Sequence, residues 1–316
     1  MKPTDPSCRR QAFRMVWQLV CLLAILSPLQ TTIADPAGFS LISPAPGVYL
    51  HTGRHEDSGP ENEGDIANVG FIVGENSVLV IDPGGSPRLG RMLLNAIRET
   101  TELPISHTVL THIHPDHILG SQVFAHTGEL VAHKRYPAAL AQRGQFYLDR
   151  FAYLFEEEEK QLPAPTVLVD GTLEVDLGNR PVIIRAHPTA HTDHDLSIHD
   201  VTTQTLWASD LVFAERIPSL DGSISGWHQE TKLLLTEDIK LIIPGHGAPA
   251  PAGVILLPQL RYLTRLLTEV REKVADNTRL ADAVEMVAKD EKSHWLLFDL
   301  YHAGNITKAY TELEWE

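Results

Sequence analysis

The chain has 316 residues, of which 43 % are hydrophobic, and its formal net charge is −15 at pH 7 with histidine neutral. This acidic excess argues against nucleic-acid binding, because proteins hold nucleic acids largely through basic contacts to phosphate. The length and the apolar content suit one large domain with room for a two-layer core.

The first 34 residues have the pattern of a cleaved export signal. Arg9, Arg10 and Arg14 form a basic start, and the mostly apolar run from Val16 to Leu26 follows it. Small residues then precede a cleavage position after Ala34. We therefore predict a signal peptide over residues 1–34 and a mature chain over residues 35–316.

Such a signal predicts a periplasmic or secreted protein. The apolar run is shorter than the about 20 residues of a membrane span, so we expect no stable span after cleavage, with an uncleaved anchor as the alternative. The pair Arg9-Arg10 is a feature of twin-arginine export, and the choice between the Sec and Tat routes stays open. Both cysteines, Cys8 and Cys21, lie in the signal, so the mature chain would contain no disulfide.

In the first half of the mature chain, apolar runs alternate with helical patterns. Strands are predicted at residues 47–51, 69–74, 77–81, 108–110 and 130–133. Helices are predicted at residues 88–99, at 134–143 with an interruption at Pro137, and at 146–160. A polar, acidic loop at residues 55–65 is of the kind that rims enzyme pockets.

The second half begins with a series of short apolar runs that predicts a second sheet. These strands are expected at residues 166–169, 173–175, 182–185, 196–199 and 205–208. A helix at residues 227–235, a buried strand at 241–243 and a largely helical extension from residue 254 complete the chain. Two sheets with helices outside them would bury this pattern best, which predicts an α/β fold in a single domain.

The segment from Thr111 to His117 (THIHPDH) places three histidines and an aspartate directly after a predicted strand. Histidine nitrogens and aspartate oxygens suit divalent zinc, and a catalytic zinc keeps one position for water or substrate. In an extended segment the side chains of His112 and His114 point the same way and can share a metal ion. Asp116 and His117 follow a proline turn and can serve a neighbouring ion. The alternative is a polar loop that is rich in histidine by chance.

Three further ligand candidates lie at or just beyond the ends of predicted strands. His191 belongs to HPTAHTDHD, Asp210 follows the strand at residues 205–208, and His246 belongs to PGHG after the last strand. Loops at these positions, held by a rigid sheet, would converge on one site.

Taken together, THIHPDH, the AHT around His191, the SD at Asp210 and PGHG resemble the ordered motifs of the metallo-β-lactamase superfamily. The resemblance implies an αβ/βα sandwich of two mixed sheets with a dinuclear zinc site at one edge. It also implies a ligand set: His112, His114 and His191 for one zinc, Asp116, His117 and His246 for the other, and Asp210 as a bridge between them.

Two zinc ions would hold a bridging hydroxide and polarise the bond to be cleaved, so no serine or cysteine nucleophile would be required. Asp116 is the candidate catalytic residue, because its carboxylate could orient the hydroxide and shuttle its proton.

A finer resemblance concerns a subfamily. Four segments are similar to the quinoprotein relay system zinc metallohydrolases, which are SoxH-related: Gly64–Gly74, Asp193–Ile198, Ser209–Trp227 and the tail ELEWE. This similarity implies a periplasmic quinoprotein partner that depends on pyrroloquinoline quinone (PQQ), and it names no substrate.

Two positions depart from other branches of the superfamily. Zinc β-lactamases usually have cysteine or serine where this chain has Asp210, and an aspartate there is similar to the thioesterase, lactonase and phosphodiesterase branches. β-Lactam hydrolysis is therefore expected only as a side activity. The flavodiiron branch has glutamate at the position of His114, which disfavours an iron redox site.

Five other residues are candidates for a substrate pocket. Asp193 and His194 follow His191 closely and form either a pocket wall or simply a polar loop. Trp227 and His228 begin a predicted helix, where they could line the entrance or serve packing and capping. Asp65 lies in the acidic loop and could meet substrate.

These features predict an exported zinc hydrolase that cleaves a small ester, thioester, lactone or related molecule. The alternative is a non-catalytic accessory protein that binds a quinone cofactor or a quinoprotein and uses zinc structurally. A complete ligand set with room for water favours the enzyme, because structural zinc sites are usually closed.

Overall fold

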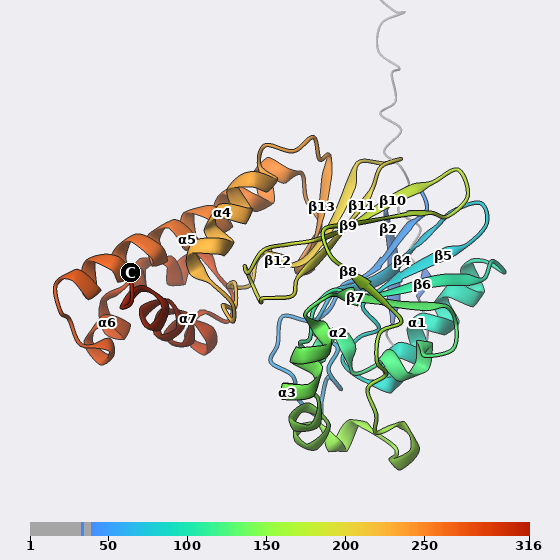
Figure 1. Cartoon of the computed structure of the whole chain (residues 1–316), viewed down its shortest axis with the longest axis horizontal. Coiled ribbons are helices and arrows are strands. Elements are labelled where there is room, and N and C mark those ends of the chain that lie inside the picture. Colours follow the sequence, from blue (N-terminus) through green and yellow to red (C-terminus); the bar gives the residue numbers. More distant parts are fainter. Residues whose placement is uncertain (1–32, 35–38) are drawn as a thin grey trace, which may run out of the picture. The chain divides into compact units, whose positions relative to one another are not determined.

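Two β-sheets pack face to face between helices in a computed structural model, which describes residues 33–34 and 39–316 (Figure 1). The described residues belong to one compact unit. The predicted signal at residues 1–34 lies outside them, except for Ile33 and Ala34, which form strand β1. None of the helices that the structure describes combines the length and the apolarity that crossing a bilayer requires.

The first sheet has eight strands in sequence order. They are β1 (Ile33–Ala34), β2 (Ser40–Ala45), β3 (Val48–His51), β4 (Val69–Val73), β5 (Val78–Ile81), β6 (Ile105–Leu110), β7 (Glu129–His133) and β8 (Val167–Val169). Pairing is antiparallel as far as β5 and parallel from β5 to β8. This sheet is therefore mixed, as predicted.

The second sheet has five strands in the order β13-β12-β11-β10-β9. They are β9 (Thr172–Asp176), β10 (Pro181–Ala186), β11 (Leu196–Asp200), β12 (Thr205–Phe213) and β13 (Leu241–His246). Only β12 and β13 pair in parallel, and α4 (Ile224–Leu234) lies between them in the sequence. A parallel pair requires such a crossover.

Strand β5 shows why both faces of the first sheet are buried. Leu79 and Ile81 point into the core between the sheets, whereas Val78 and Val80 pack on the outer side against α1 (Pro87–Thr100). Side chains alternate between the two faces of a strand, so a strand covered on both sides is apolar throughout. From the second sheet, Trp207 of β12 enters the same inner core.

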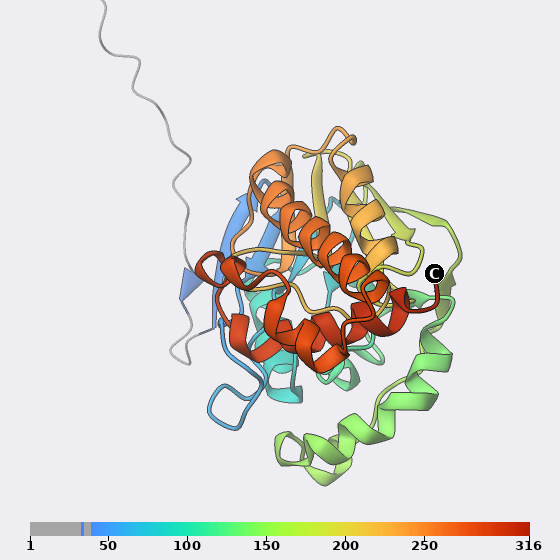
Figure 2. The same cartoon turned by 90° about the vertical axis from the view of Figure 1, so that its left-hand side faces the viewer.

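The remaining helices cover the outer faces. On the side of the first sheet lie α2 (Pro115–Ile118), the 3₁₀ turn η1 (Ser121–Phe124), α3 (Tyr136–Arg150) and the turns η2 (Ala152–Leu154) and η3 (Glu157–Glu159). The C-terminal helices, which face the viewer in Figure 2, are α5 (Ala252–Ala275), α6 (Leu280–Met286), the turn η4 (Lys289–His294) and α7 (Phe298–Leu313). They share a large core with β12 and α4. The predicted αβ/βα sandwich is confirmed.

Several predicted boundaries were wrong. The two helices predicted at residues 134–160 are one helix, α3, because Pro137 lies in its first turn, where a proline costs no hydrogen bond. This helix ends at Arg150, and only short 3₁₀ turns follow it. Strand β2 was not predicted. Asp210 lies inside β12 and does not follow its end.

Candidate metal centre

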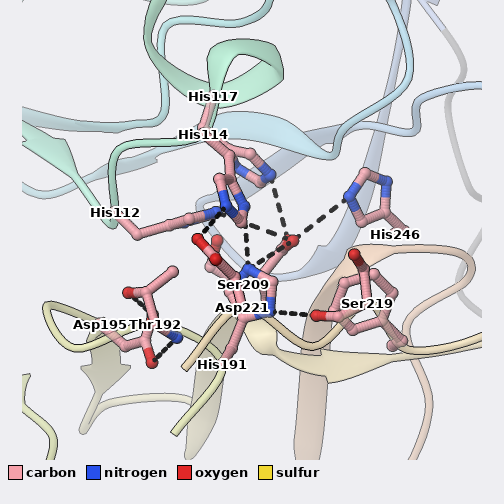
Figure 3. Close-up of polar contacts among 12 residues, drawn as sticks. His112, His114, His117, His191, Thr192, Asp195, Ser209, Ser219, Asp221 and His246 are labelled. Carbon is pink, nitrogen blue, oxygen red and sulfur yellow. Dashed lines mark hydrogen bonds and ion pairs between the residues drawn. The ribbon is translucent and has the colours of Figure 1, made fainter. Parts of the chain in front are cut away.

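The seven predicted ligand residues lie together at one edge of the sandwich. Figure 3 shows the five histidines among them. Two groups could each hold a metal ion: the first ligand group is His112, His114, His191 and Asp210, and the second is Asp116, His117 and His246. Within each group the ligand atoms lie within 4.8 Å of one another. The grouping counts Asp210 with the first group, whereas the sequence resemblance implies it as a bridge between two ions.

Apart from Asp210, which lies within β12, each ligand residue is held at the end of a strand or in a turn beside one. His112 and His114 follow β6, and Pro115 begins the one-turn helix α2, which carries Asp116 and His117. His191 lies in the connection between β10 and β11, and His246 is the last residue of β13.

Asp210 reaches both groups because β12 is irregular around it. The pairing register of β12 with β13 shifts on both sides of Ser209, and Ser209 itself has a φ of 47°. Gly245 of β13 packs against the aspartate so closely that a Cβ there would lie 1.8 Å from Asp210 Oδ1. The glycine of PGHG is therefore required by the position of the Asp210 carboxylate.

The distances around Asp210 fit metal coordination. Its Oδ2 lies 3.4 Å from His191 Nε2 and 3.5 Å from His246 Nε2. Its Oδ1 lies 3.1 Å from His117 Nε2. Ligands about 2.0–2.2 Å from a tetrahedral ion are roughly 3.3–3.6 Å from one another. The carboxylate is therefore placed to contribute to both groups.

Unpaired buried atoms provide an independent test of the fit. Within the described part of the chain, nine buried side-chain atoms make no hydrogen bond, and three of them are His112 Nε2, His117 Nε2 and Asp210 Oδ1. A buried polar atom without a partner costs about 1–3 kcal/mol, so native structures rarely leave three together. All three belong to the ligand groups, and a cation between them would satisfy them.

The outer nitrogen of every imidazole in the two groups has a partner. The pairs are His112 Nδ1 with Thr111 Oγ1 (3.0 Å), His114 Nε2 with Asp221 Oδ2 (3.2 Å), His117 Nδ1 with Asp82 Oδ2 (2.8 Å), His191 Nδ1 with the Ser219 carbonyl (2.7 Å) and His246 Nδ1 with the Ile66 carbonyl (2.6 Å). Such acceptors fix which nitrogen carries the proton and leave the inner one free to bind a metal.

Asp82 is a buried residue beside the site whose hydrogen-bonding role was not predicted from the sequence. Besides His117, its carboxylate accepts hydrogen bonds from the Thr111 amide (2.9 Å), the Thr111 hydroxyl (2.8 Å) and the Ser209 hydroxyl (3.1 Å). Asp82 precedes Pro83-Gly84-Gly85, and this sequence has the pattern of a turn. An acidic residue at the end of an apolar strand was the available signal.

The electrostatics of the site favour metal-binding protonation states at most positions. Burial lowers the pKa of His191 to about 3 and lowers that of His112 well below its usual value. Burial alone would raise the pKa of Asp210, but His117 and His246 hold it well below the usual range. His117 is the exception, since Asp210 and Asp116 outweigh burial and raise its pKa. A metal would have to displace its proton.

The site opens on the side of His114 and Asp116. Their side chains are 18 % and 12 % exposed, whereas those of His191 and Asp210 are at most 4 % exposed. Burial would raise the pKa of the Asp116 carboxyl, but His117 and His246 lower it, so the group is a carboxylate at neutral pH. Asp116 is thus the ligand residue that is both charged and reachable from outside.

The candidate pocket residues have different surroundings. His194 Nε2 accepts a hydrogen bond from the Ile113 amide (3.1 Å), and its Nδ1 donates to Asp193 (2.6 Å). Both line a cavity of about 280 Å³ that also includes Asp221 and Arg143.

The other three candidates are held by contacts of different kinds. Trp227 is completely buried, donates from Nε1 to the Leu211 carbonyl (2.8 Å) and packs its ring 5.3 Å from that of His191. His228 contacts Thr264 of α5 (3.1 Å), and the Asp65 carboxylate pairs with His51 (2.7 Å). Packing is therefore the role that the structure shows for Trp227.

The sequence model of the metallo-beta-lactamase superfamily matches residues 62–246. That range contains all seven residues of the two ligand groups. No curated protein matches the chain.

Solved structures share the fold. A metallo-beta-lactamase from Pontibacter korlensis superposes with a TM-score of 0.59 and 17 % identity, over 72 % of this chain and 99 % of that one. TMB-1 superposes with a TM-score of 0.57 and 15 % identity, over 72 % and 97 %. A metallo-beta-lactamase from Hirschia baltica gives 0.56 and 17 %, over 71 % and 96 %. The C-terminal helices α5 to α7 follow the end of the family match.

Proposed function

This chain belongs to the metallo-beta-lactamase superfamily, and on that premise we propose that it is an exported hydrolase with two zinc ions per chain. The family and the histidine and aspartate groups together indicate a metallo-hydrolase. One observation carries the proposal. The two ligand groups meet at Asp210, and the inner nitrogens of His112 and His117 are buried without a hydrogen-bond partner.

The donor set supports zinc. It consists of imidazole nitrogens and carboxylate oxygens, and no cysteine occurs after Cys21. When bound, two such ions would supply an activated water and polarise the bond to be cleaved. The chain's own residues would hold the ions, and the outer acceptors of the five imidazoles would keep their rings oriented.

We propose Asp116 as the catalytic carboxylate. It is charged, lies on the open side of the site, and its Oδ2 is 3.4 Å from His246 Nε2. From this position it would accept a proton from the attacking water and return it to the leaving group.

The proposed substrate is a small ester, thioester, lactone or related molecule. Support comes from Asp210, since the thioesterase, lactonase and phosphodiesterase branches that this chain resembles have an aspartate there. β-Lactam hydrolysis would be a side activity. The periplasmic location rests on the signal pattern, and the quinoprotein partner rests on the similarity of segments such as Gly64–Gly74 and Ser209–Trp227.

A hydrolysis panel tests this function. Zinc-loaded mature protein and its Asp116→Ala variant would be assayed with ester, lactone, thioester, phosphodiester and β-lactam substrates. We expect turnover of at least one ester-like class, and a loss of about 10²–10⁴-fold in the variant. No turnover above the variant on any substrate would favour the alternative, an accessory protein that binds a quinone cofactor or a quinoprotein.

A further inference from the structure

The segment between β12 and α4, residues 214–223, binds the outer nitrogens of two histidines of the first ligand group. Its Ser219 carbonyl accepts the hydrogen bond from His191 Nδ1 (2.7 Å), and its Asp221 carboxylate accepts that from His114 Nε2 (3.2 Å) (Figure 3). The amides of Asp221 and Gly222 also donate to the His191 carbonyl, at 3.1 and 2.6 Å. Two of the three histidines of the first ligand group thus depend on where this segment lies.

Helix α7 holds the same segment at four points. The contacts are Tyr301 with Arg216 (guanidinium carbon 4.8 Å from the ring centroid), Asn305 with Pro218 and Leu220, Lys308 with Asp221 (3.6 Å), and Glu312 with Ser223 (2.8 Å). The spacings along α7 are four, three and four residues, which places all four side chains on one helix face. One face of α7 therefore runs along the segment that orients His114 and His191.

Asn305 makes the most constrained of these contacts. Its Oδ1 accepts from the Leu220 amide (2.9 Å), and its Nδ2 donates to the Pro218 carbonyl (2.6 Å) and to the Tyr262 hydroxyl (2.9 Å). The residue is 2 % exposed, so water cannot replace the lost bonds if the amide is removed. The Pro218 carbonyl and the Leu220 amide belong to the residues immediately before and after Ser219.

A second helix, α3, also holds the Asp221 carboxylate. Arg143 of α3, which precedes Asp221 in the sequence whereas α7 follows it, donates two hydrogen bonds to the Asp221 carboxylate. Asp221 is therefore fixed by Arg143, Lys308 and its own backbone, and the geometry leaves its Oδ2 directed to His114 Nε2. Helix α3 belongs to the family match at residues 62–246, whereas α7 lies beyond it.

We propose that α7 is part of the metal centre, and that Asn305 is a positioning residue for the first ligand group. Asn305 fixes the Ser219 carbonyl, the carbonyl orients His191, and the rest of the α7 face keeps Asp221 on His114. The path through Asn305 and Ser219 does not reach the second ligand group, whose outer partners are Asp82 for His117, and the Ile66 carbonyl and the Arg216 guanidinium (3.1 Å) for His246. The inference rests on the proposed metal site and is independent of the substrate.

The test measures zinc affinity separately for each group. A His246→Ala background removes one ligand of the second group and leaves the first group complete. A His191→Ala background removes one ligand of the first group and leaves the second group complete. Zinc dissociation constants are determined by competition with a chromophoric chelator, with and without Asn305→Ala. Loss of a residue that orients a metal-binding histidine typically weakens binding 10–100-fold. We expect that loss in the His246→Ala background and less than a three-fold change in the His191→Ala background.

Ile306→Ala is the matched control. Ile306 is the next residue on α7, is completely buried in the C-terminal core, and has a hydrocarbon side chain that makes none of the hydrogen bonds to residues 214–223. Its truncation should destabilise the metal-free protein in thermal melts while leaving zinc affinity unchanged. Equal zinc affinity with and without Asn305→Ala in the His246→Ala background overturns the inference, and so does an equal loss in Ile306→Ala. If Asn305→Ala weakens zinc as expected but no substrate is turned over, only the proposed function fails.

Discussion

His117 Nδ1 lies 2.8 Å from the Asp82 carboxylate, and both side chains are completely inaccessible to solvent. The pair joins the end of β5 to helix α2 and directs His117 Nε2 toward Asp210. A buried carboxylate that orients a histidine also increases its basicity as a metal ligand. The first prediction concerns this contact.

Replacing Asp82 by Asn should weaken metal binding at the second ligand group by about 10–100-fold, because the charge that supports the His117 imidazole is lost. A chelator competition titration measures the effect. Asp65→Asn is a suitable control, since Asp65 also pairs with a histidine, His51, but contacts neither ligand group. Unchanged zinc affinity in Asp82→Asn would show that the contact serves stability alone.

The second prediction concerns Gly245. A methyl group there would lie 1.8 Å from Asp210 Oδ1, so Gly245→Ala must displace the carboxylate that joins the two ligand groups. We expect the variant to bind fewer zinc ions per chain than the wild type. Gly253→Ala, in the first turn of helix α5 with open space around its Cβ, should keep the full metal content. A Gly245→Ala protein with normal metal content would contradict the assigned role of Asp210.

How much of this site the sequence predicts depends on the kind of group. The seven ligand residues are predictable because histidine and aspartate in short motifs leave a signal of residue type. The carbonyls of Ser219 and Ile66 leave none, since any residue can supply a carbonyl. The role of Asn305 also leaves no signal in the sequence, because it depends on the packing of α7 against Leu220, which lies more than eighty residues earlier in the chain.

The fold shows the same division. Continuous apolar runs predict most strands of both sheets, although not β2, because alternate residues face different cores, as Leu79 and Val80 do. The irregular path of β12 is not predictable from alternation, because it arises from the left-handed backbone of Ser209 and the close approach of Gly245. Asp210 was therefore placed at the end of a strand when it lies within one.

The third prediction concerns the buried ion pair of Arg180 and Asp200. The guanidinium donates to Asp200 of β11 (2.6 Å), to the Val73 carbonyl of β4 and to the Pro46 carbonyl in the turn between β2 and β3 (both 2.8 Å), so it joins the two sheets. Arg180→Met should lower the free energy of unfolding by about 3–5 kcal/mol, because the Asp200 charge stays buried without a partner. Urea denaturation measures this. The double variant with Asp200→Asn should be less destabilised than the two single changes added together, and strict additivity would argue against a coupled pair.

The fourth prediction is a pH dependence. Burial raises the pKa of Asp195 to about 6, despite hydrogen bonds from the Thr192 amide and hydroxyl. Since the folded pKa exceeds the unfolded one, Asp195 contributes stability at pH below about 4, and this contribution is lost as the pH rises through about 6.

Metal-free wild type should therefore lose stability relative to Asp195→Asn between pH 4 and pH 7, by roughly 3 kcal/mol at most. Chemical denaturation in the presence of a chelator gives both curves. A constant difference between wild type and variant across this range would mean that the Asp195 carboxyl is not perturbed.

The central claim is that the two ligand groups hold two zinc ions that share Asp210. Elemental analysis of the purified mature protein, with the protein concentration determined independently, tests it most directly. We predict about two zinc ions per chain and no iron, as a two-metal hydrolase requires. One metal ion or fewer per chain, or iron in place of zinc, would contradict the account.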